Sequence, residues 1–311
     1  MQEKTICLFG GSGFIGRRIC QELAAQGHSI RIATRDPKNA QSIDAHGSVD
    51  KINIVECEYD EVSIQQAIQG CDIVINLVGI LYEKGQNTFQ RIHTDLPEKI
   101  AKACKTQKIK TFIHLSALGI DISESQYAAS KLSGEKALLK EFPKAVILRP
   151  SIVFGSDDNF FNMFADLSKL LPALPLIGGG KTKFQPVYVG DIADAITNII
   201  SQKDVQLSDV EGQVFELGGP DVESFKQLFD RLLEETNRRR FLMPLPFPVA
   251  KIQAMVMSLA PKPLLTPDQV ASLKSDNIVS KSSKTLNNLG VAPTSMDKIL
   301  PTYLGSHKKA S

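Results

Sequence analysis

The 311-residue sequence contains no tryptophan and no CxxC pair, and it has neither a long hydrophobic run nor a strong excess of one charge. The five cysteines are scattered through apolar or helix-like runs, so we expect reduced, buried thiols and neither a disulfide framework nor a metal site. The formal net charge of +2 argues against a general attraction to nucleic acid. The lack of a long apolar run argues against a membrane-spanning helix.

The remaining composition is that of a globular protein, with 42% hydrophobic and 23% charged residues. A chain of this length can bury one large core and a smaller lobe. The first apolar run begins close to the amino terminus, which leaves no room for a secretory signal. We therefore expect a cytoplasmic protein.

The most informative motif is a glycine-rich run that lies between an apolar stretch and a helical pattern. It consists of Gly10, Gly11, Ser12, Gly13, Phe14, Ile15 and Gly16. We expect Gly10 to allow a tight turn, Gly13 to let the backbone approach a pyrophosphate, and Gly16 to let the helix pack closely on the strand. The free N–H groups and the dipole at the start of the helix favour a bound anion. The motif therefore predicts a dinucleotide-binding turn.

Strand-like and helix-like segments alternate as far as about residue 150. Strands are expected over residues 6–9, 29–34, 52–55, 72–77, 111–115 and 145–148, and helices over 14–25, 61–69, 87–105 and 125–140. Alternation with short connections favours a parallel sheet that is covered by helices on both faces. We predict an α/β fold, a Rossmann-type doubly wound parallel sheet, with residues 1–150 as the dinucleotide-binding domain.

The pattern loosens after residue 150. Residues 170–180 are rich in proline and glycine and predict a connector. A strand over 184–189, a helix capped by Asp191, a strand over 213–217 and a helix over 224–235 follow. We expect residues 151–311 to form a smaller, mostly helical α/β lobe for a substrate or partner, with Rossmann elements near 184–217.

Ligands of such a sheet bind at the carboxyl ends of the strands. Arg35 ends the second predicted strand, where an arginine accommodates the 2′-phosphate of NADP, so we expect NADP(H) to bind better than NAD(H). Asp36 follows, but the adjacent Pro37 indicates that Asp36 has already turned into the loop. Arg17 or Arg18 is a candidate for a second cation at the phosphate.

Tyr127 and Lys131 form the second chemical pattern, because residues four apart on a helix share a face. A nearby ammonium favours the phenolate and should lower the pKa of Tyr127, which suits proton transfer at a carbonyl or alcohol. Lys131 can also bind a ribose. The alternative is a helix that carries this pair by chance. His93 and His114 have no partners at metal-ligand spacing and are interpreted as core or surface histidines.

These motifs resemble the short-chain dehydrogenase/reductase superfamily in its extended and atypical branches. The similarity covers about two-thirds of the chain and rests on residues 10–16, 76–79, 148–155 and 187–193 and on the Tyr127 and Lys131 pair. Longer strings at 77–82, 115–119, 158–162, 184–191, 245–248 and 265–270 are similar to bacterial relatives of the NADPH-binding accessory subunit of respiratory complex I.

The resemblance implies a tightly held NADP(H), whose role in that subgroup is structural, and respiratory-complex subunits as partners. It implies a cofactor site at Gly10, Ser12, Gly13, Phe14, Ile15, Gly16, Arg35, Val78, Gly79, Tyr127, Lys131 and Pro150. Tyr127 and Lys131 match the catalytic pair of the extended enzymes. Their serine or threonine usually lies about two dozen residues before the tyrosine, whereas Ser116 lies eleven before Tyr127. Ser116 either completes the catalytic set or simply closes its strand.

Residues 248–260 carry a further apolar stripe at helical spacing, formed by Val249, Ile252, Met255, Val256 and Leu259. Packing into the small lobe is the interpretation we favour. Docking to a membrane surface, on its inner face, or to a hydrophobic partner subunit is the alternative. The basic run at 238–240 is expected to be solvated, and contact with acidic lipid or with a partner is the alternative.

Three functions are consistent with these patterns. The first is an accessory or assembly subunit of a respiratory complex with a structural nucleotide. The second is an active NADP-dependent oxidoreductase or sugar-nucleotide epimerase that uses Tyr127 and Lys131. The third is a redox-state sensor that binds NADP(H) and a protein partner without turnover.

Overall fold

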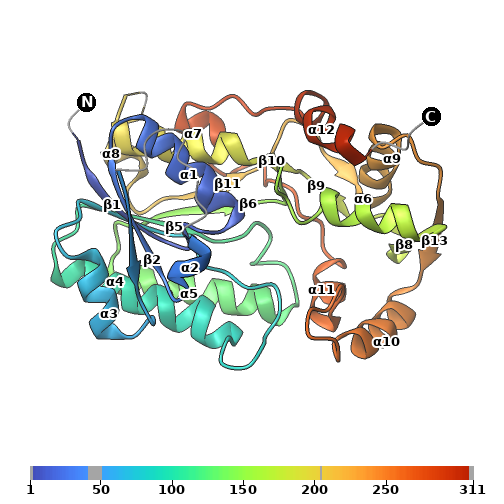
Figure 1. Cartoon of the computed structure of the whole chain (residues 1–311), viewed down its shortest axis with the longest axis horizontal. Helices are drawn as coiled ribbons and strands as arrows, with labels where there is room; N and C mark the ends of the chain where they lie inside the picture. Colours follow the sequence, from blue (N-terminus) through green and yellow to red (C-terminus); the bar gives the residue numbers. More distant parts are fainter. Residues whose placement is uncertain (1–2, 41–50, 204, 308–311) are drawn as a thin grey trace.

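A seven-stranded parallel sheet is the centre of the larger part of the molecule (Figure 1), in a computed structural model that describes residues 3–40, 51–203 and 205–307. The strand order is β3-β2-β1-β4-β5-β6-β11. The strands are β1 Thr5–Phe9, β2 Ser29–Thr34, β3 Ile52–Glu56, β4 Ile73–Asn76, β5 Thr111–Leu115, β6 Val146–Pro150 and β11 Val214–Leu217. All neighbouring strands are parallel. The predicted Rossmann-type sheet is confirmed, and its order reverses between β1 and β4, where such folds bind ligands.

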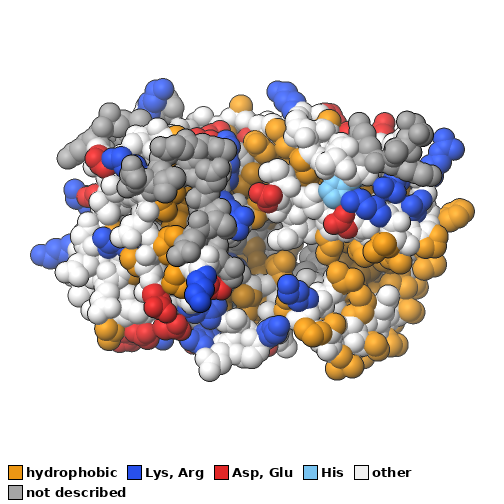
Figure 2. Space-filling model, viewed as in Figure 1, with side chains coloured by type: hydrophobic (Ala, Val, Ile, Leu, Met, Phe, Trp, Pro, Cys, Tyr) orange, Lys and Arg blue, Asp and Glu red, His pale blue; other side chains and the backbone are white. Residues whose placement is uncertain are grey.

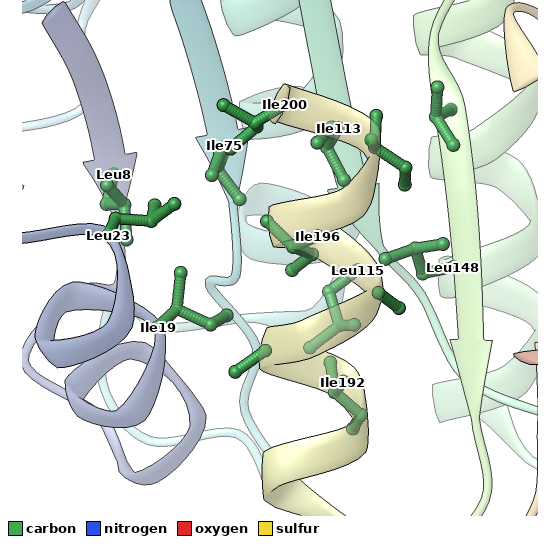
Figure 3. Packing of buried hydrophobic residues seen from close by; sticks show 14 of the residues in the cluster. Leu8, Ile19, Leu23, Ile75, Ile113, Leu115, Leu148, Ile192, Ile196 and Ile200 are labelled. Atoms are coloured by element: carbon green, nitrogen blue, oxygen red, sulfur yellow. The ribbon is translucent and has the colours of Figure 1, made fainter. Parts of the chain in front are cut away.

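Helices cover both faces of this sheet, because its strands carry apolar side chains in both directions. α1 (Phe14–Ala25) and α7 (Val189–Ser201) pack on one face. Figure 3 shows their side chains lying between the helices and the sheet: Ile19, Leu23, Ile192, Ile196 and Ile200 from the helices, and Leu8, Ile75, Ile113, Leu115 and Leu148 from the strands. The other face is covered by α3 (Glu61–Ile68), α4 (Leu96–Thr106) and α5 (Gln126–Glu141).

The helix expected over 87–105 is divided in two. A π-helix over Gln90–Asp95 precedes α4. Pro97 has no N–H to donate to the carbonyl four residues earlier, that of His93. This carbonyl lies against Gly134 of α5, where a Cβ would come within 1.8 Å of the His93 oxygen. The proline and the glycine together allow the two segments to pack closely.

A second core holds the carboxyl-terminal lobe together, and it is rich in phenylalanine. α6 (Phe161–Leu170), α9 (Phe225–Glu235) and α12 (Met296–Leu304) pack around Phe161, Phe225 and Phe229. Three two-stranded sheets complete this region: β7 Val153–Phe154 with β10 Val187–Tyr188, β9 Lys183–Phe184 with β12 Glu223–Ser224, and β8 Ala173–Ile177 with β13 Phe241–Leu245. α10 (Phe247–Met257) and α11 (Pro267–Ser272) follow β13 as a helical pair.

The remaining elements are short. They are α2 (Pro37–Ala40), α8 (Leu207–Val210) and the 3₁₀ helices Gly178–Gly180, Leu286–Leu289 and Gly305–His307. None of the helices in the described ranges has the length and apolarity needed to cross a membrane. All five cysteines are free and buried, as expected.

Three sequence predictions in this lobe are wrong. The expected connector at 170–180 contains β8, whose partner β13 follows far later in the chain and gives no local signal. The expected strand over 184–189 is two short strands, and α7 already begins at Val189 with Tyr188 as its N-cap. Asp191 therefore lies inside the first turn and does not cap the helix. Its buried carboxylate accepts hydrogen bonds of 2.7 Å from both the N–H and the hydroxyl of Thr294.

Candidate functional site

The glycine turn connects β1 to α1 and contains a left-handed residue. Gly10 has φ +82°, and its carbonyl accepts a hydrogen bond of 3.1 Å from the N–H of Gly13. A Cβ on Gly16 would lie 2.3 Å from the Gly10 oxygen, so only glycine allows this approach. Gly13 is the N-cap of α1 and provides no side-chain cap. The first N–H groups of α1 are thus left without a side-chain partner, as an anion site at a helix start requires.

The remaining turn residues lie around this opening. Gly13 is exposed, and Ser12, Phe14 and Ile15 are half-buried. The carbonyl of Ser12 accepts a hydrogen bond of 2.9 Å from Arg17 Nε, which braces the turn. Arg18 is paired with Glu22.

The neighbouring strand β4 ends against the same turn. The position of a Cβ on Gly10 would be 3.1 Å from the backbone of Leu77 and of Val78. Asn76 holds this segment, because its Oδ1 accepts a hydrogen bond of 3.1 Å from the Val78 N–H and its Nδ2 lies 3.1 Å from His114 Nδ1. His114 is buried, and burial holds its pKa well below the ordinary value. It is therefore a neutral core histidine that supports the strand ends.

Arg35 lies just beyond the end of β2. Its guanidinium carbon is 4.9 Å from the centre of the Tyr59 ring, and its Nη1 donates a hydrogen bond of 2.6 Å to Asn87 Oδ1. The ring and the amide fix the guanidinium without neutralising it, so its charge is available to an anion. Asp36 is exposed and lies beyond Arg35, before α2.

Tyr127 and Lys131 lie on the first two turns of α5, and Lys131 reaches the segment after β4. Lys131 Nζ donates a hydrogen bond of 3.3 Å to the Leu115 carbonyl and would be 3.4 Å from a Cβ on Gly79. Burial lowers the pKa of Lys131 to about 8, opposed by the nearby Glu135 carboxylate. The predicted lowering of the Tyr127 pKa is wrong. Burial raises the pKa of Tyr127 to about 12, because desolvation disfavours the phenolate.

His93 belongs to this cluster, although its spacing in the sequence did not reveal it. Its ring meets the Tyr127 ring edge-on, with centroids 5.1 Å apart. Its Nε2 accepts a hydrogen bond of 3.0 Å from the Ile80 N–H, so Nδ1 carries the proton and donates to Ser130 Oγ at 2.9 Å. Ser130 in turn donates to the Tyr127 carbonyl. Burial lowers the pKa of His93 to about 3, so the ring is neutral at physiological pH.

A buried ion pair lies behind Lys131. The Arg149 guanidinium donates two hydrogen bonds, of 3.0 and 2.7 Å, to the Glu135 carboxylate. Pro150 ends β6, the strand that also carries Arg149, and its carbonyl accepts a hydrogen bond of 2.9 Å from the Leu118 N–H. Ser116 is also buried, and its hydroxyl has no hydrogen-bond partner among the described residues.

Asp268 is the second site residue that the sequence did not reveal. It lies on α11, yet its carboxylate accepts hydrogen bonds from the N–H groups of Gln126 (2.7 Å) and Tyr127 (3.0 Å). It therefore caps the helix that carries Tyr127 and Lys131, together with the N-cap Ser125. More than 140 residues separate the two segments, so no local pattern could have indicated this contact.

A match to a family model identifies the chain. The model of the NAD dependent epimerase/dehydratase family matches residues 6–218. The chain belongs to this family. The match spans the whole seven-stranded sheet and both chemical motifs, and it confirms the predicted resemblance to extended short-chain dehydrogenases. A nicotinamide dinucleotide, NAD or NADP, is the cofactor class of the family.

Two relatives share most of the chain. The mitochondrial NADH dehydrogenase (ubiquinone) 1 alpha subcomplex subunit 9 of Arabidopsis thaliana is 31% identical over 315 residues, which is 97% of this chain and 77% of the relative. The subunit of the same name from Mus musculus is 33% identical over 93% of this chain and 77% of the relative. Both cover the carboxyl-terminal lobe as well as the sheet.

Solved structures share the fold at low sequence identity. The NADPH-dependent quinone oxidoreductase of Escherichia coli, in complex with NADPH, has a TM-score of 0.72 at 20% identity, over 97% of this chain and 99% of that one. The dTDP-glucose 4,6-dehydratase of Streptomyces venezuelae, with NAD bound, has a TM-score of 0.74 at 15% identity, over 96% and 95%.

The residues at the carboxyl edge fit a dinucleotide. Four features lie together at the strand ends: the uncapped start of α1, the close approach at Gly16, the exposed backbone of Gly79 beside Lys131, and the Ser116 hydroxyl without a partner among the described residues. The turn would hold the pyrophosphate, and Lys131 would hold a ribose. A bound nicotinamide dinucleotide supplies hydride donation or acceptance.

Proposed function

We propose that this chain is an accessory or assembly subunit of a respiratory complex related to complex I, and that it holds NADP(H) as a structural nucleotide. The observation that carries the proposal is the similarity over 97% of the chain to a relative named as a subunit of NADH dehydrogenase. The environment of Tyr127 supports it. The Tyr127 ring packs edge-on against Phe89 and His93, and a phenol whose pKa burial raises to about 12 is a poor proton-transfer group at neutral pH.

We propose that the two parts of the chain have different roles. Residues 1–150 form the dinucleotide-binding domain, and residues 151–311 form a partner lobe with Rossmann elements near 184–217. Tyr127, Lys131 and the turn at Gly10 to Gly16 hold the nucleotide. We place the protein on the cytoplasmic side, with respiratory-complex subunits as partners.

Preference for NADP(H) over NAD(H) is assigned to Arg35. Its guanidinium is fixed by Tyr59 and Asn87 but has no carboxylate partner among the described residues. A 2′-phosphate would provide this partner, whereas the ribose hydroxyl of NAD would not.

The test is to purify the tagged chain from its native cells with its partners, as wild type and with Tyr127→Phe or Lys131→Ala. We expect respiratory-complex subunits to co-purify with wild type and with Tyr127→Phe. Lys131→Ala should reduce nucleotide retention and assembly together. Wild-type protein that elutes alone, free of respiratory subunits, would refute the accessory role.

A second candidate is an active NADP-dependent oxidoreductase, favoured by a cavity that is lined by Gln126, the residue before Tyr127 on α5. The cavity measures about 830 Å³ and is lined by Phe89 on one side and by Phe247, Lys251 and Val270 on the other. Phe89 also stacks on His93. If this cavity receives a substrate, Tyr127→Phe should cut turnover by about 10²–10⁴-fold while nucleotide binding persists. Undiminished turnover in that variant would remove Tyr127 from the catalytic role.

A further inference from the structure

α10 carries its large apolar side chains on the outside. The helix buries only Ala250 and Ala254, which lie one turn apart. Ile252 is 60% exposed and Val256 is 66% exposed. The interpretation of this stripe as part of the small lobe's core is therefore wrong. The alanines are small enough to let the helix lie close to Ile177 and Val270, and this leaves the larger side chains in solvent.

The exposed apolar surface extends from α10 onto β13 before it, onto the loop beyond it, and onto the end of α6, which lies next to the start of β13. Ten of the fifteen exposed large hydrophobic side chains of the described residues lie here; these ten residues are called the α10 patch: Leu170, Leu171, Phe241, Met243, Val249, Ile252, Met255, Val256, Leu259 and Leu264. Figure 2 shows apolar side chains gathered over α10 and β13. A contiguous apolar surface of this kind marks an interaction site.

The segment that carries eight of the ten residues of the α10 patch has charges of one sign. Residues 236–267 contain five basic residues and no aspartate or glutamate, in a chain whose net charge is only +2. The basic residues are Arg238, Arg239, Arg240, Lys251 and Lys262. Arg238 and Arg240 donate to the carbonyls of His307 (3.2 Å) and Ser168 (2.7 Å), which corrects the expectation of a fully solvated run. None of the five forms an ion pair within the described part of the chain.

We propose that the α10 patch docks on an anionic phospholipid bilayer, with α10 lying in the plane of the headgroups. Apolar side chains would enter the acyl boundary, while the basic residues would meet the lipid phosphates. An 11-residue helix is only about 16 Å long, too short to cross about 30 Å of hydrocarbon. The five basic residues of this segment, none of them in an ion pair with a described residue, favour an anionic membrane over an apolar protein groove, which would leave these cations without partners.

Vesicle flotation of the purified full-length chain tests this docking. The probe is phosphatidylcholine vesicles with and without phosphatidylglycerol, at low salt and at physiological salt. We expect wild-type protein to float with the anionic vesicles, to remain unbound with the neutral ones, and to bind less as salt rises. Val256→Asp should weaken binding at least tenfold, because the carboxylate would enter the acyl boundary.

Val62 provides a matched control for this variant. It is also a valine with 66% exposure, but it lies on α3, outside the α10 patch. Val62→Asp should leave vesicle binding unchanged, and both variants should melt at the wild-type temperature because both side chains are exposed. Lys251→Gln should weaken binding by about fivefold, the effect of one basic residue near an anionic surface.

Three results would overturn the proposal. The first is wild-type protein that does not float with anionic vesicles. The second is equal loss of binding in Val62→Asp and Val256→Asp. The third is a wild-type dimer that Val256→Asp converts to a monomer, which would assign the α10 patch to a second copy of the chain. Vesicle binding is measured without nucleotide or respiratory subunits, so its failure is distinct from failure of the proposed accessory role.

Discussion

α1 and α10 are helices of nearly equal length, 12 and 11 residues, with opposite relations to solvent. α1 buries Ile19 and Leu23 against the sheet and leaves its uncapped N-terminus open at the glycine turn. α10 buries two alanines and exposes its larger apolar side chains. The comparison teaches that an apolar stripe predicts a contact but does not say with what. For α1 the contact is the protein's own sheet, whereas for α10 we infer an outside surface.

The largest predicted effect is on stability, and it separates the two helices directly. Ile19 is fully buried and Ile252 is 60% exposed. Ile19→Ala should lower the free energy of unfolding by about 2–5 kcal/mol, since it removes buried methyl groups and leaves a cavity. Ile252→Ala should change it by less than about 0.5 kcal/mol. Urea unfolding measures both, and equal losses would mean that α10 belongs to the core.

Nucleotide selectivity should depend on residues at the edge of the sheet where α1 begins, and not on α10. Arg35→Ala should reduce the preference for NADPH over NADH by about tenfold to a hundredfold, the value of one charged hydrogen bond to the 2′-phosphate. Titration by NADPH fluorescence gives both affinities, with Lys251→Gln on α10 as the control that should keep the wild-type ratio. An unchanged ratio of the two affinities in Arg35→Ala would show that another group binds the 2′-phosphate.

Asp268 connects the two regions, because it lies on α11 and caps α5. Asp268→Asn keeps the size of the side chain but replaces one acceptor oxygen by an amide and removes the charge beside the helix start. We expect a loss of about 1 kcal/mol in unfolding free energy. Asp276→Asn is a suitable control, since Asp276 caps no helix and bonds only the N–H of Lys183 among the described contacts of its carboxylate. A larger loss from the control than from Asp268→Asn would contradict the capping role.

The smallest effect concerns pH. Burial lowers the pKa of Lys131 to about 8 from an ordinary value of 10.5, so its charge is lost as the pH rises through about 8. NADPH affinity should then fall by about fivefold between pH 7 and 9, the difference between a charged and a neutral hydrogen bond. The free energy of unfolding should change in the opposite direction to the affinity. Between pH 8 and 10.5 the unfolded chain binds more protons at Lys131 than the folded chain does, so the contribution of Lys131 to stability rises with pH.

A matched variant checks this assignment. Lys131→Arg retains its charge across the whole range and should show no such fall in affinity. A wild-type affinity that does not change between pH 7 and 9 would mean that the ammonium of Lys131 contributes no charge-dependent contact to the nucleotide.

The sheet and the glycine turn could be predicted because their signals are local. Gly10 and Gly16 show their spacing within seven residues, and Asp60, directly before α3, caps that helix through the N–H groups of Val62 and Ser63. By contrast, β8 forms only because β13 supplies its partner strand much later in the chain. Long-range pairing leaves no periodic trace in either segment.

The support around Tyr127 was missed for the same reason. His93 reaches Ser130 across 37 positions of the chain, and Asp268 reaches Tyr127 across 141. The direction of the Tyr127 pKa shift was also wrong, since the sequence shows the nearby lysine but not the burial that outweighs its charge.

The most direct test of the account is the identity of the nucleotide that the purified protein retains. The protein is passed through gel filtration and denatured, and the released nucleotide is identified by mass spectrometry for wild type and for Lys131→Ala. The account predicts about one NADP(H) for each wild-type chain and little or none for Lys131→Ala, with the two proteins equally folded. Retention of NAD(H) instead, or no nucleotide in the wild-type protein, would contradict it.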